Sequence, residues 1–379
     1  MAENTSLHSA RNAKNDEFYT QYSDIEAEMN AYVEFNPDVF RDKTVLLPCD
    51  DPEWSNFTKY FAANFERFGL KKLISTSYAK SVGSKQLTLL EQRSPMFDAN
   101  KHDTHGKLFI LERDMNGFGR IDTDDIKFSG YLEGDGDFRS VEVTTLRDEA
   151  DVIITNPPFS LFREFLAWIL EAGKQFVIVG NKNAITYKEV FPLLRDNKMW
   201  VGYRPVNQDF WLRVPDGASF EKVQEDGTPL KHIMACWFTN LDHGKRHQSL
   251  QLDTMEHNLK FNKKLRKKFE KDYGKLEYPH YDNYDAIEVP FVEAIPSDYD
   301  GVMGVPITFM DKYNPEQFEI VAFRKGEDGK DLVFTRERER ESSTVLSYPC
   351  STAIAGMIKN AEGKINGKIT YARITIRRK

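Results

Sequence analysis

The chain has 379 residues, of which 40% are hydrophobic and 13% aromatic. This is enough for a packed core and more than one domain of average size. Its three cysteines form no CxxC pair, which argues against a disulfide framework and a zinc site, so we expect no metal. The N-terminus lacks the apolar core of a signal peptide, and no apolar run approaches the roughly 18 residues that span a bilayer. We therefore expect a cytoplasmic protein with no membrane partner.

The net charge is −7 and the sequence pI is about 5.7, which argues against a polyanionic partner. Charge is nevertheless segregated along the chain. Between Lys260 and Lys275, eight basic residues face only two acidic ones, and the C-terminal residues 372–379 are again basic. A chain segregated in this way can bind an anion with one face while it remains acidic overall.

The first predicted elements alternate between helix and strand. Residues 16–32 have the spacing of a helix, and residues 43–48 form an apolar run that a proline stops. Residues 55–69 follow as a second helix, with Ser55 as a plausible N-cap and Gly69 at the end. Residues 71–77 are a second strand. This order is β-α-β.

The alternation resumes after a polar span (residues 79–105), a Gly/Asp turn (130–138) and a short helix around 144–149. Residues 151–155 and 175–180 are predicted strands, and residues 160–173 and 186–197 are predicted helices. This spacing favours a parallel, Rossmann-like α/β sheet with helices on both faces. Residues 199–206 and 232–241 look like strands without a helix between them, which suggests an antiparallel addition at one edge.

The alternation of predicted strands and helices ends near residue 240, where we place a domain boundary. Residues 1–15 are expected to be a flexible tail, residues 16–240 a catalytic domain, and residues 241–379 a target-recognition region. Near the C-terminus, residues 362–379 predict a hairpin that turns at Asn366-Gly367.

The strand at 151–155 runs directly into Asn156, Pro157, Pro158 and Phe159. In an open α/β sheet, ligands bind beyond the carboxyl ends of the strands. The two prolines stiffen the loop, so that the Asn156 amide oxygen and the Pro157 backbone oxygen can face one point beside a flat aromatic ring. Such a site suits a planar group bearing an amine, and it would act by orientation and electrostatics. The alternative is a simple strand-terminating turn.

These four residues resemble the [D/N/S]PP[Y/F/W] motif of amino-methyltransferases that use S-adenosylmethionine. The wider chain resembles the adenine-specific DNA methyltransferase family of the EcoRI modification enzyme. The resemblance is carried by "NDEFYTQYSDIE", "CDDPEWSNFTKYFAANFERFGLKKLI", "GDGDF", "NPPFS" and "GVPITFMDKYNPEQFEI". It implies a class I methyltransferase fold and transfer of a methyl group to N6 of an adenine flipped out of double-stranded DNA.

The resemblance also implies a set of cofactor-binding residues. Phe18 and Tyr19 would wall the cofactor pocket, and Thr20 would bind the methionine carboxylate, although this segment could also be a helix start that buries two aromatics. Asp50 or Asp51 would reach the cofactor ammonium group, although this strand end lacks the usual glycine-rich turn and could be a helix-entry turn. The third motif would contribute Asp135, Asp137 and Phe138, in a Gly/Asp loop that does not complete an EF-hand.

The basic run could clamp DNA phosphates, or it could be a solvated helix face. The residues concerned are Lys263, Lys264, Arg266, Lys267 and Lys268. The resemblance thus implies a DNA adenine N6-methyltransferase of a restriction-modification type, and a monomer is favoured because each strand can be modified in a separate event. The alternatives are the same chemistry on RNA adenine or on protein glutamine, and a DNA-binding relative that has lost activity. Glutamine enzymes tend to carry tyrosine at the position of Phe159.

Overall fold

The computed structural model describes residues 19–52, 55–79, 97–112, 130–208, 210–214, 219–324, 364–370 and 372–379. The chain divides into two compact units. The first comprises Met1–Val190 and Met199–Gly244, and the second comprises Phe191–Lys198 and Lys245–Lys379. In the described part of the chain, no helix is long and apolar enough to cross a membrane.

An eight-stranded sheet forms the centre of the first unit, with the strand order β4-β3-β2-β1-β5-β6-β11-β7. The four central strands, β2, β1, β5 and β6, are parallel, and antiparallel strands extend the sheet at both edges. This confirms the predicted α/β class and the antiparallel addition at one edge, whereas the opposite edge, β3 and β4, was not predicted. The strands are β1 (Thr44–Leu47), β2 (Lys72–Thr76), β3 (Lys107–Glu112), β4 (Gly130–Tyr131), β5 (Val152–Thr155), β6 (Gln175–Asn181), β7 (Trp200–Val201) and β11 (Ala235–Thr239).

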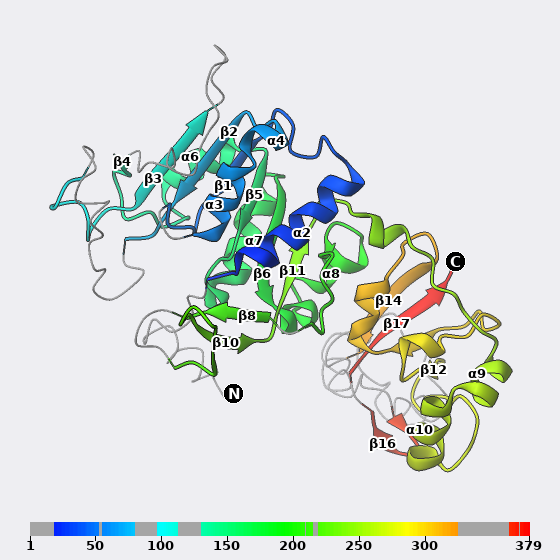
Figure 1. Cartoon of the computed structure of the whole chain (residues 1–379). Coiled ribbons are helices and arrows are strands. Elements are labelled where there is room, and N and C mark those ends of the chain that lie inside the picture. The colour runs from blue at the N-terminus through cyan, green and yellow to red at the C-terminus, as the bar shows by residue number, and fades with distance from the viewer. Residues whose placement is uncertain are drawn as a thin grey trace, which may run out of the picture. The chain divides into compact units, whose positions relative to one another are not determined.

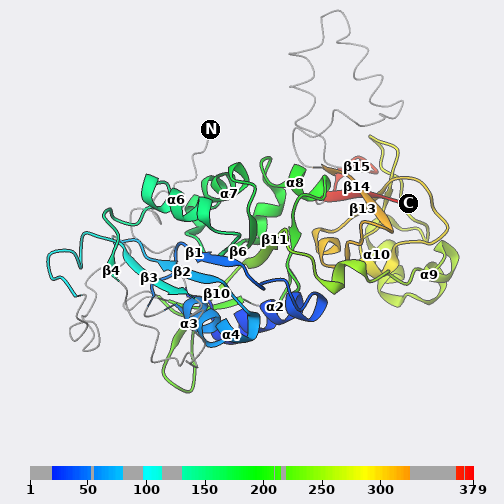
Figure 2. The same cartoon turned by 90° about the horizontal axis from the view of Figure 1, so that it is seen from above.

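Helices cover both faces of this sheet, as Figure 2 shows: α6 and α7 lie on one side, and α2, α3 and α4 on the other (Figures 1 and 2). Parallel strands buried on both faces consist of nearly continuous apolar residues, and all four residues of β1 and of β5 are buried. The helices are α2 (Tyr22–Phe35), α3 (Asn56–Ala63), α4 (Phe65–Phe68), α6 (Val141–Glu149) and α7 (Phe162–Glu171).

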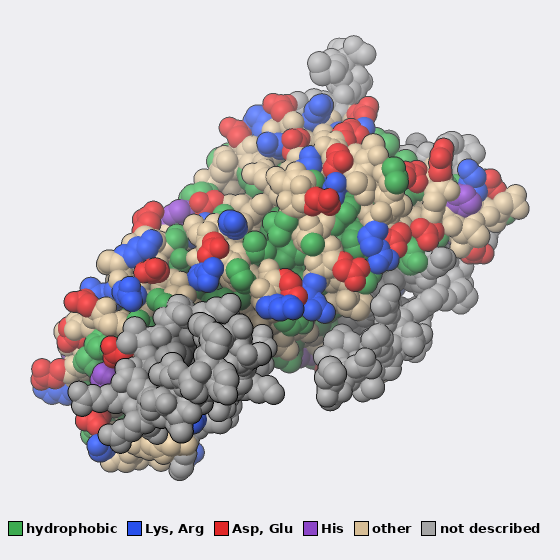
Figure 3. Space-filling view, turned by 180° about the vertical axis from the view of Figure 1, so that it is seen from behind, with side chains coloured by type: hydrophobic (Ala, Val, Ile, Leu, Met, Phe, Trp, Pro, Cys, Tyr) green, Lys and Arg blue, Asp and Glu red, His purple; other side chains and the backbone are tan. Residues whose placement is uncertain are grey.

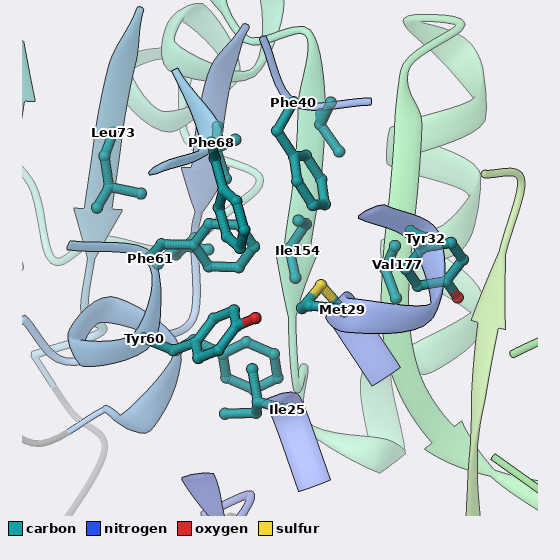
Figure 4. Packing of buried hydrophobic residues seen from close by; sticks show 14 of the residues in the cluster. Ile25, Met29, Tyr32, Phe40, Tyr60, Phe61, Phe68, Leu73, Ile154 and Val177 are labelled. Atoms are coloured by element: carbon teal, nitrogen blue, oxygen red, sulfur yellow. The ribbon is translucent and has the colours of Figure 1, made fainter. Parts of the chain in front are cut away.

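One hydrophobic cluster joins the helices on the α2 side to the sheet (Figure 4). Aromatic rings of α3 and α4 point at β2 and β5, and α2 contributes Ile25, Met29 and Tyr32, all fully buried. The helices begin and end where their sequences indicate. Ser55 caps α3 by accepting a hydrogen bond from the Phe57 amide, as predicted, and Gly69 ends α4 in the left-handed region with φ 62°.

Two predicted elements are shorter in the structure, each for a local reason. The helix expected at 186–197 is reduced to α8 (Phe191–Arg195), because Pro192 lacks the amide that would continue a helix from upstream. The strand expected at 199–206 ends at Val201. There the Glu28 carboxylate accepts hydrogen bonds from the amides of Tyr203 (2.7 Å) and Arg204 (2.9 Å), so these amides do not join the sheet.

A small antiparallel sheet, β8-β10-β9, completes the first unit. Tyr19 pairs with Arg213 of β8 through two backbone hydrogen bonds of 2.9 and 3.0 Å. The predicted helix at 16–32 therefore starts later, at Tyr22, because an extended bridge and a helix exclude one another at Tyr19. The strands are β8 (Phe210–Arg213), β9 (Lys222–Val223) and β10 (Pro229–Ile233).

The second unit holds a four-stranded sheet, β12-β13-β17-β14, and a helical pair, α9 and α10. The predicted hairpin is confirmed at its turn, since β15 and β16 pair antiparallel around Asn366 (φ 51°) and Gly367 (φ 73°). The rest of the predicted span does not belong to the hairpin, because residues 373–378 form β17 and pair with β13 and β14. Its elements are α9 (Met255–Phe261), α10 (Lys263–Tyr273), β12 (Ile287–Glu288), β13 (Met303–Val305), β14 (Phe318–Arg324), β15 (Lys364–Ile365), β16 (Lys368–Ile369) and β17 (Arg373–Arg378). Short 3-10 helices across the chain are η2 (Phe159–Leu161), η3 (Lys182–Thr186), η4 (Gly244–His247), η5 (Val292–Ala294) and η6 (Ile307–Lys312).

Candidate active site at the carboxyl edge of the parallel strands

The carboxyl ends of β2, β1 and β5 lie at one edge of the sheet because the three strands are parallel neighbours. The chain runs from β1 to β2 on one side of β1, and it later returns to β5 on the other side. Strand order therefore reverses between β1 and β5. In α/β sheets such a reversal opens the crevice in which ligands bind. The residues that follow these strands are the first place to look for a site.

The Asp50 side chain ties the ends of β1 and β5 together. Its carboxyl accepts hydrogen bonds from Ser55 Oγ and from Thr155 Oγ1, both at 2.6 Å, and the residue is only 6% exposed. Its backbone is held by β2, since the Asp50 amide donates to the Thr76 carbonyl (2.9 Å) and Ser75 Oγ donates to the Asp50 carbonyl (2.6 Å). One residue thus links three parallel strands to the start of α3.

Burial raises the pKa of Asp50 to about 7, and the hydrogen bonds from Ser55 and Thr155 offset part of this rise. Desolvation disfavours the charged form of a carboxyl, whereas hydroxyl donors favour it. The Asp50 carboxyl therefore titrates near neutral pH, next to the residue that precedes Asn156. The sequence pointed to Asp50 as a cofactor contact but gave no sign of this bridge to Thr155, which lies 105 residues away.

The Asn-Pro-Pro-Phe loop (residues 156–159) starts directly after Thr155. Pro157 is buried, whereas Asn156, Pro158 and Phe159 are half-buried. The Pro158 carbonyl accepts from the Leu161 amide (2.9 Å), which starts the short η2 helix that leads into α7. The Phe159 ring packs at the margin of the core cluster. The loop is therefore held at both ends, by Asp50 at its start and by α7 at its end.

The N-terminal segment reaches the same edge. Asn56, the first residue of α3, donates to the Thr20 carbonyl at 2.9 Å, next to the Ser55 that contacts Asp50. Thr20 is 3% exposed, and its hydroxyl oxygen has no hydrogen-bond partner among the described residues. A buried hydroxyl without a partner is costly and indicates a missing ligand or water. Tyr19 is half-buried beside Thr20, and the predicted Phe18 lies outside the described residues.

Asp51 lies beside basic groups that the sequence did not single out. The Nζ atom of Lys107, at the start of β3, is 3.6 Å from Asp51 Oδ2, and the two side chains are 2% and 12% exposed. Burial lowers the pKa of Lys59 on α3, the charge of Arg213 lowers it further, and Asp51 partly opposes both effects. Nothing in the local sequence around Lys59 or Lys107 marks them, because their proximity to Asp51 arises only from the fold.

The third predicted motif packs against the end of β2. The Ala79 amide donates to the Asp135 carbonyl at 2.7 Å. A Cβ atom on Gly136 would lie 2.1 Å from the Ser77 carbonyl oxygen, and one on Gly106 would lie 2.5 Å from the same atom. This close approach requires glycine at both positions, and Gly136 also has a φ of 80°.

The side chains of this third motif face different surroundings. Asp135 Oδ1 accepts from the Asp137 amide at 3.2 Å, and the Asp137 carboxylate is gripped by Arg139 through bonds of 2.9 and 2.7 Å. Phe138 is 5% exposed and packs edge-on against Phe165 of α7, with ring centroids 5.0 Å apart. The fold therefore brings Thr20, Asp50, Asp51, Asp135 and the Asn-Pro-Pro-Phe loop to one edge of the sheet.

The predicted basic residues lie on α10 in the second unit and fall into two groups. Lys264 pairs with Glu293 (3.2 Å), and Lys268 pairs with Asp272 (2.5 Å). Lys263, Lys267 and Lys271, spaced by four residues, form an exposed row that we call the basic row. None of the three forms an ion pair with a carboxylate in the described part of the chain. Arg266 is exposed, and its guanidinium contacts the Lys260 carbonyl at 3.5 Å.

The negative net charge does not mean that the surface is uniformly negative. On the face of the molecule in Figure 3, basic and acidic side chains are interspersed. A partner that approaches α10 therefore meets the local charge of that helix rather than the average of the chain.

Among the described residues, no group of three or more His, Cys, Asp or Glu could hold a metal ion. Cys350 lies outside the described residues.

An α/β sheet with a parallel centre, whose strand order reverses at a rigid Asn-Pro-Pro-Phe loop, defines a class, the amino-methyltransferases with a Rossmann-like fold. Comparison with known proteins narrows this class. The model of the family described as "Adenine-specific methyltransferase EcoRI" matches residues 6–379, and the chain belongs to this family. It is therefore a methyltransferase.

Curated relatives agree with the family. The chain is 43% identical over 336 residues to the Type II methyltransferase M.EcoRI of Escherichia coli, covering 87% of this chain and 93% of the relative. It is 34% identical over 320 residues to the Type II methyltransferase M.MpnI of Mycoplasma pneumoniae, covering 82% and 83%. No solved structure matches the chain.

Proposed function

We propose that this protein is an S-adenosylmethionine-dependent DNA adenine N6-methyltransferase that modifies a flipped adenine within a specific duplex site, as the modifying partner in restriction-modification. The observation that carries the proposal is the Asn-Pro-Pro-Phe loop, anchored through Thr155 to Asp50 where the sheet order reverses. The family and the Type II relatives support the choice of DNA adenine over RNA adenine or glutamine.

The residues along the sheet edge fit S-adenosylmethionine. This cofactor carries an ammonium group and a carboxylate, and it needs both acceptors and donors. The Thr20 hydroxyl is a buried donor that lacks a partner among the described residues, and it suits the carboxylate. Asp51, 12% exposed, offers an acceptor for the ammonium group. Asp135, half-buried on the loop that packs against β2, would receive the adenosine end, with Asp137 and Phe138 shaping that loop.

When bound, the cofactor supplies an electrophilic methyl group. The chain's own residues then have to present the amine to it. The Asn156 amide oxygen and the Pro157 carbonyl would accept the two N6 hydrogens, which turns the nitrogen lone pair away from the base plane. The Phe159 ring would stack on the base. This arrangement works by orientation and preorganised electrostatics, so the loop needs no strong base.

The target base has to leave the duplex before it can reach this loop, because an amine in a base stack is inaccessible. Flipping costs a few kcal/mol, which the contacts with DNA must offset. We assign phosphate contact to the exposed cations of α10, with Lys263, Arg266 and Lys267 contributing more than the ion-paired Lys264 and Lys268. The second unit, which carries α10, would then take part in target binding.

Substitution of Asn156 tests the assigned chemistry. Asn156→Ala removes one acceptor, so we expect kcat for methyl transfer to duplex DNA to fall roughly 100- to 1,000-fold. Binding of S-adenosylmethionine, measured by calorimetry, should change little. Asn156→Asp retains an acceptor oxygen and should keep more activity than the alanine variant.

The matched control is Asn183→Ala, which alters an exposed asparagine after the neighbouring strand β6. It should behave like the unaltered chain. Unchanged turnover in Asn156→Ala would remove the loop from the mechanism. Label transfer to RNA or protein instead of duplex DNA would redirect the substrate assignment.

A further inference from the structure

Phe261 is an aromatic side chain that the second unit leaves in solvent. It is the last residue of α9 and is 59% exposed, whereas Leu265 and Phe269 of the adjoining α10 are fully buried. Burying a phenylalanine side chain contributes about 1.5–3 kcal/mol. A single exposed apolar residue is ordinary on a protein surface, so exposure alone says little. The surroundings of Phe261 are what distinguish it.

A lysine and a histidine lie against the Phe261 ring. Lys260 Nζ is 5.3 Å from the ring centroid, and the His257 ring packs against Phe261 in a tilted orientation, with the ring centroids 4.6 Å apart. Lys263, two residues later, starts the basic row on α10. Asn262 joins the two helices by capping α10 through the Leu265 amide at 3.0 Å. The ring therefore sits at a fixed helix corner, next to the exposed lysines.

We propose that Phe261 makes an apolar contact with the bases of bound duplex DNA, while the basic row holds the adjacent phosphates. The inference rests on the proposed function and adds a contact residue to it. An exposed aromatic ring beside cations matches a polyanion that carries flat apolar bases. Proteins that deform DNA insert Phe or other apolar side chains between base steps, and stacking on an aromatic contributes about 1–3 kcal/mol per base.

The charge pattern favours DNA over a second protein as the occupant of this corner. Lys263, Lys267 and Lys271 repeat every four residues, or about 6 Å along the helix axis, with no carboxylate pair in the described part of the chain. Interfaces between proteins tend to be depleted of lysine, whereas phosphate contacts require such cations. Phe261 supplies the apolar part of the same surface.

The two kinds of contact differ in their response to salt. Phosphate contacts release counterions, so they set the slope of log K against log salt concentration. A stacking contact releases none. Phe261→Ala should therefore weaken duplex binding roughly 5- to 150-fold and leave the slope unchanged. Lys263→Gln with Lys267→Gln should lower the slope.

The experiment titrates a labelled duplex DNA, chosen as one to which the unaltered chain transfers methyl groups, with the full chain and follows binding by fluorescence anisotropy at several salt concentrations. The matched control is Phe35→Ala, because Phe35 also ends a helix and is 45% exposed, but α2 has no basic residue in its last turn. Phe35→Ala should bind as the unaltered chain does. Phe261→Trp should retain binding, and its added fluorescence should be quenched by duplex DNA.

The outcomes separate this inference from the proposed function. If the unaltered chain binds and methylates DNA but Phe261→Ala binds equally well, the contact is wrong and the function stands. A reduced salt slope in Phe261→Ala would also overturn it, because the effect would then be electrostatic. If the unaltered chain neither binds nor methylates duplex DNA, both fail. Absence of quenching in a Phe261→Trp chain that binds DNA contradicts base contact.

Discussion

At the scale of single residues, the Asp50 carboxyl should make stability depend on pH. Burial raises its pKa in the folded chain to about 7, compared with about 3.9 when unfolded. Between these two values the folded state binds more protons than the unfolded state. The contribution of Asp50 to stability is therefore fully present below pH 4 and is lost as the pH rises through 7. The three-unit difference corresponds to a loss of about 4 kcal/mol at most. Urea unfolding from pH 4 to pH 8 measures this loss.

Asp50→Asn should flatten this dependence, because the amide does not titrate while it preserves the shape of the side chain. Its oxygen can still accept from Ser55 or Thr155, so the fold should survive. Asp38→Asn is the control, since Asp38 is exposed and forms only a surface ion pair with Arg41. Parallel pH profiles for Asp50→Asn and the unaltered chain would show that Asp50 does not titrate in this range.

At the scale of elements, α10 should contribute to DNA binding unevenly. The double variant Lys263→Gln with Lys267→Gln removes two cations that have no described carboxylate partner, so the salt slope should fall by about two. Lys264→Gln with Lys268→Gln removes the same charge from the same helix. These two lysines already engage Glu293 and Asp272, so a smaller change in slope is expected. Anisotropy titrations at varied salt compare the two; equal slopes would mean that ion pairing does not select the phosphate contacts.

Local sequence predicted the elements well where it carries its own boundaries. Apolar runs that end at or next to proline or glycine became β1, β5 and β6, and the turn chemistry of Asn366-Gly367 produced the hairpin. The predictions were wrong where a residue far away in the sequence determines where an element ends. The strand at 199–206 stops because Glu28 takes the amides of Tyr203 and Arg204, some 175 residues away. No local pattern could reveal that contact.

At the scale of the whole molecule, the site also depends on contacts that no local sequence pattern reveals. The Asn-Pro-Pro-Phe loop was visible in the sequence because its four residues are contiguous. The Asp50–Thr155 bond, the approach of Lys107 to Asp51 and the pairing of Tyr19 with Arg213 join segments 56 to 194 residues apart, and each exists only once the sheet has formed. The contacts that anchor the loop therefore depend on the folded sheet, whereas the loop itself can be predicted from the sequence.

The second unit has an internal ion pair. We expect the loss of this pair to destabilise the second unit and to leave the first unit unchanged. Arg373 of β17 contacts Glu288 of β12 at 2.6 Å, and the side chains are 12% and 1% exposed. Tyr281 also donates a hydrogen bond to this carboxylate. Arg373→Met would leave a buried carboxylate without its cation, which costs about 3–5 kcal/mol. Hydrogen exchange should show lost protection in β12, β13 and β17.

Strands β1 and β5 should keep their protection in this variant, because their hydrophobic cluster lies entirely within the first unit. Arg377→Met is the control on the same strand. Its pair with Glu319 spans 3.8 Å with both side chains about half exposed, so it should cost about 0–1 kcal/mol. Replacing both Glu288 and Arg373 by methionine should recover much of the stability, since no buried charge remains. Equal loss of protection in β1 and β17 would instead show that the two units unfold as one, so that damage in the second unit would also reach the Asn-Pro-Pro-Phe loop.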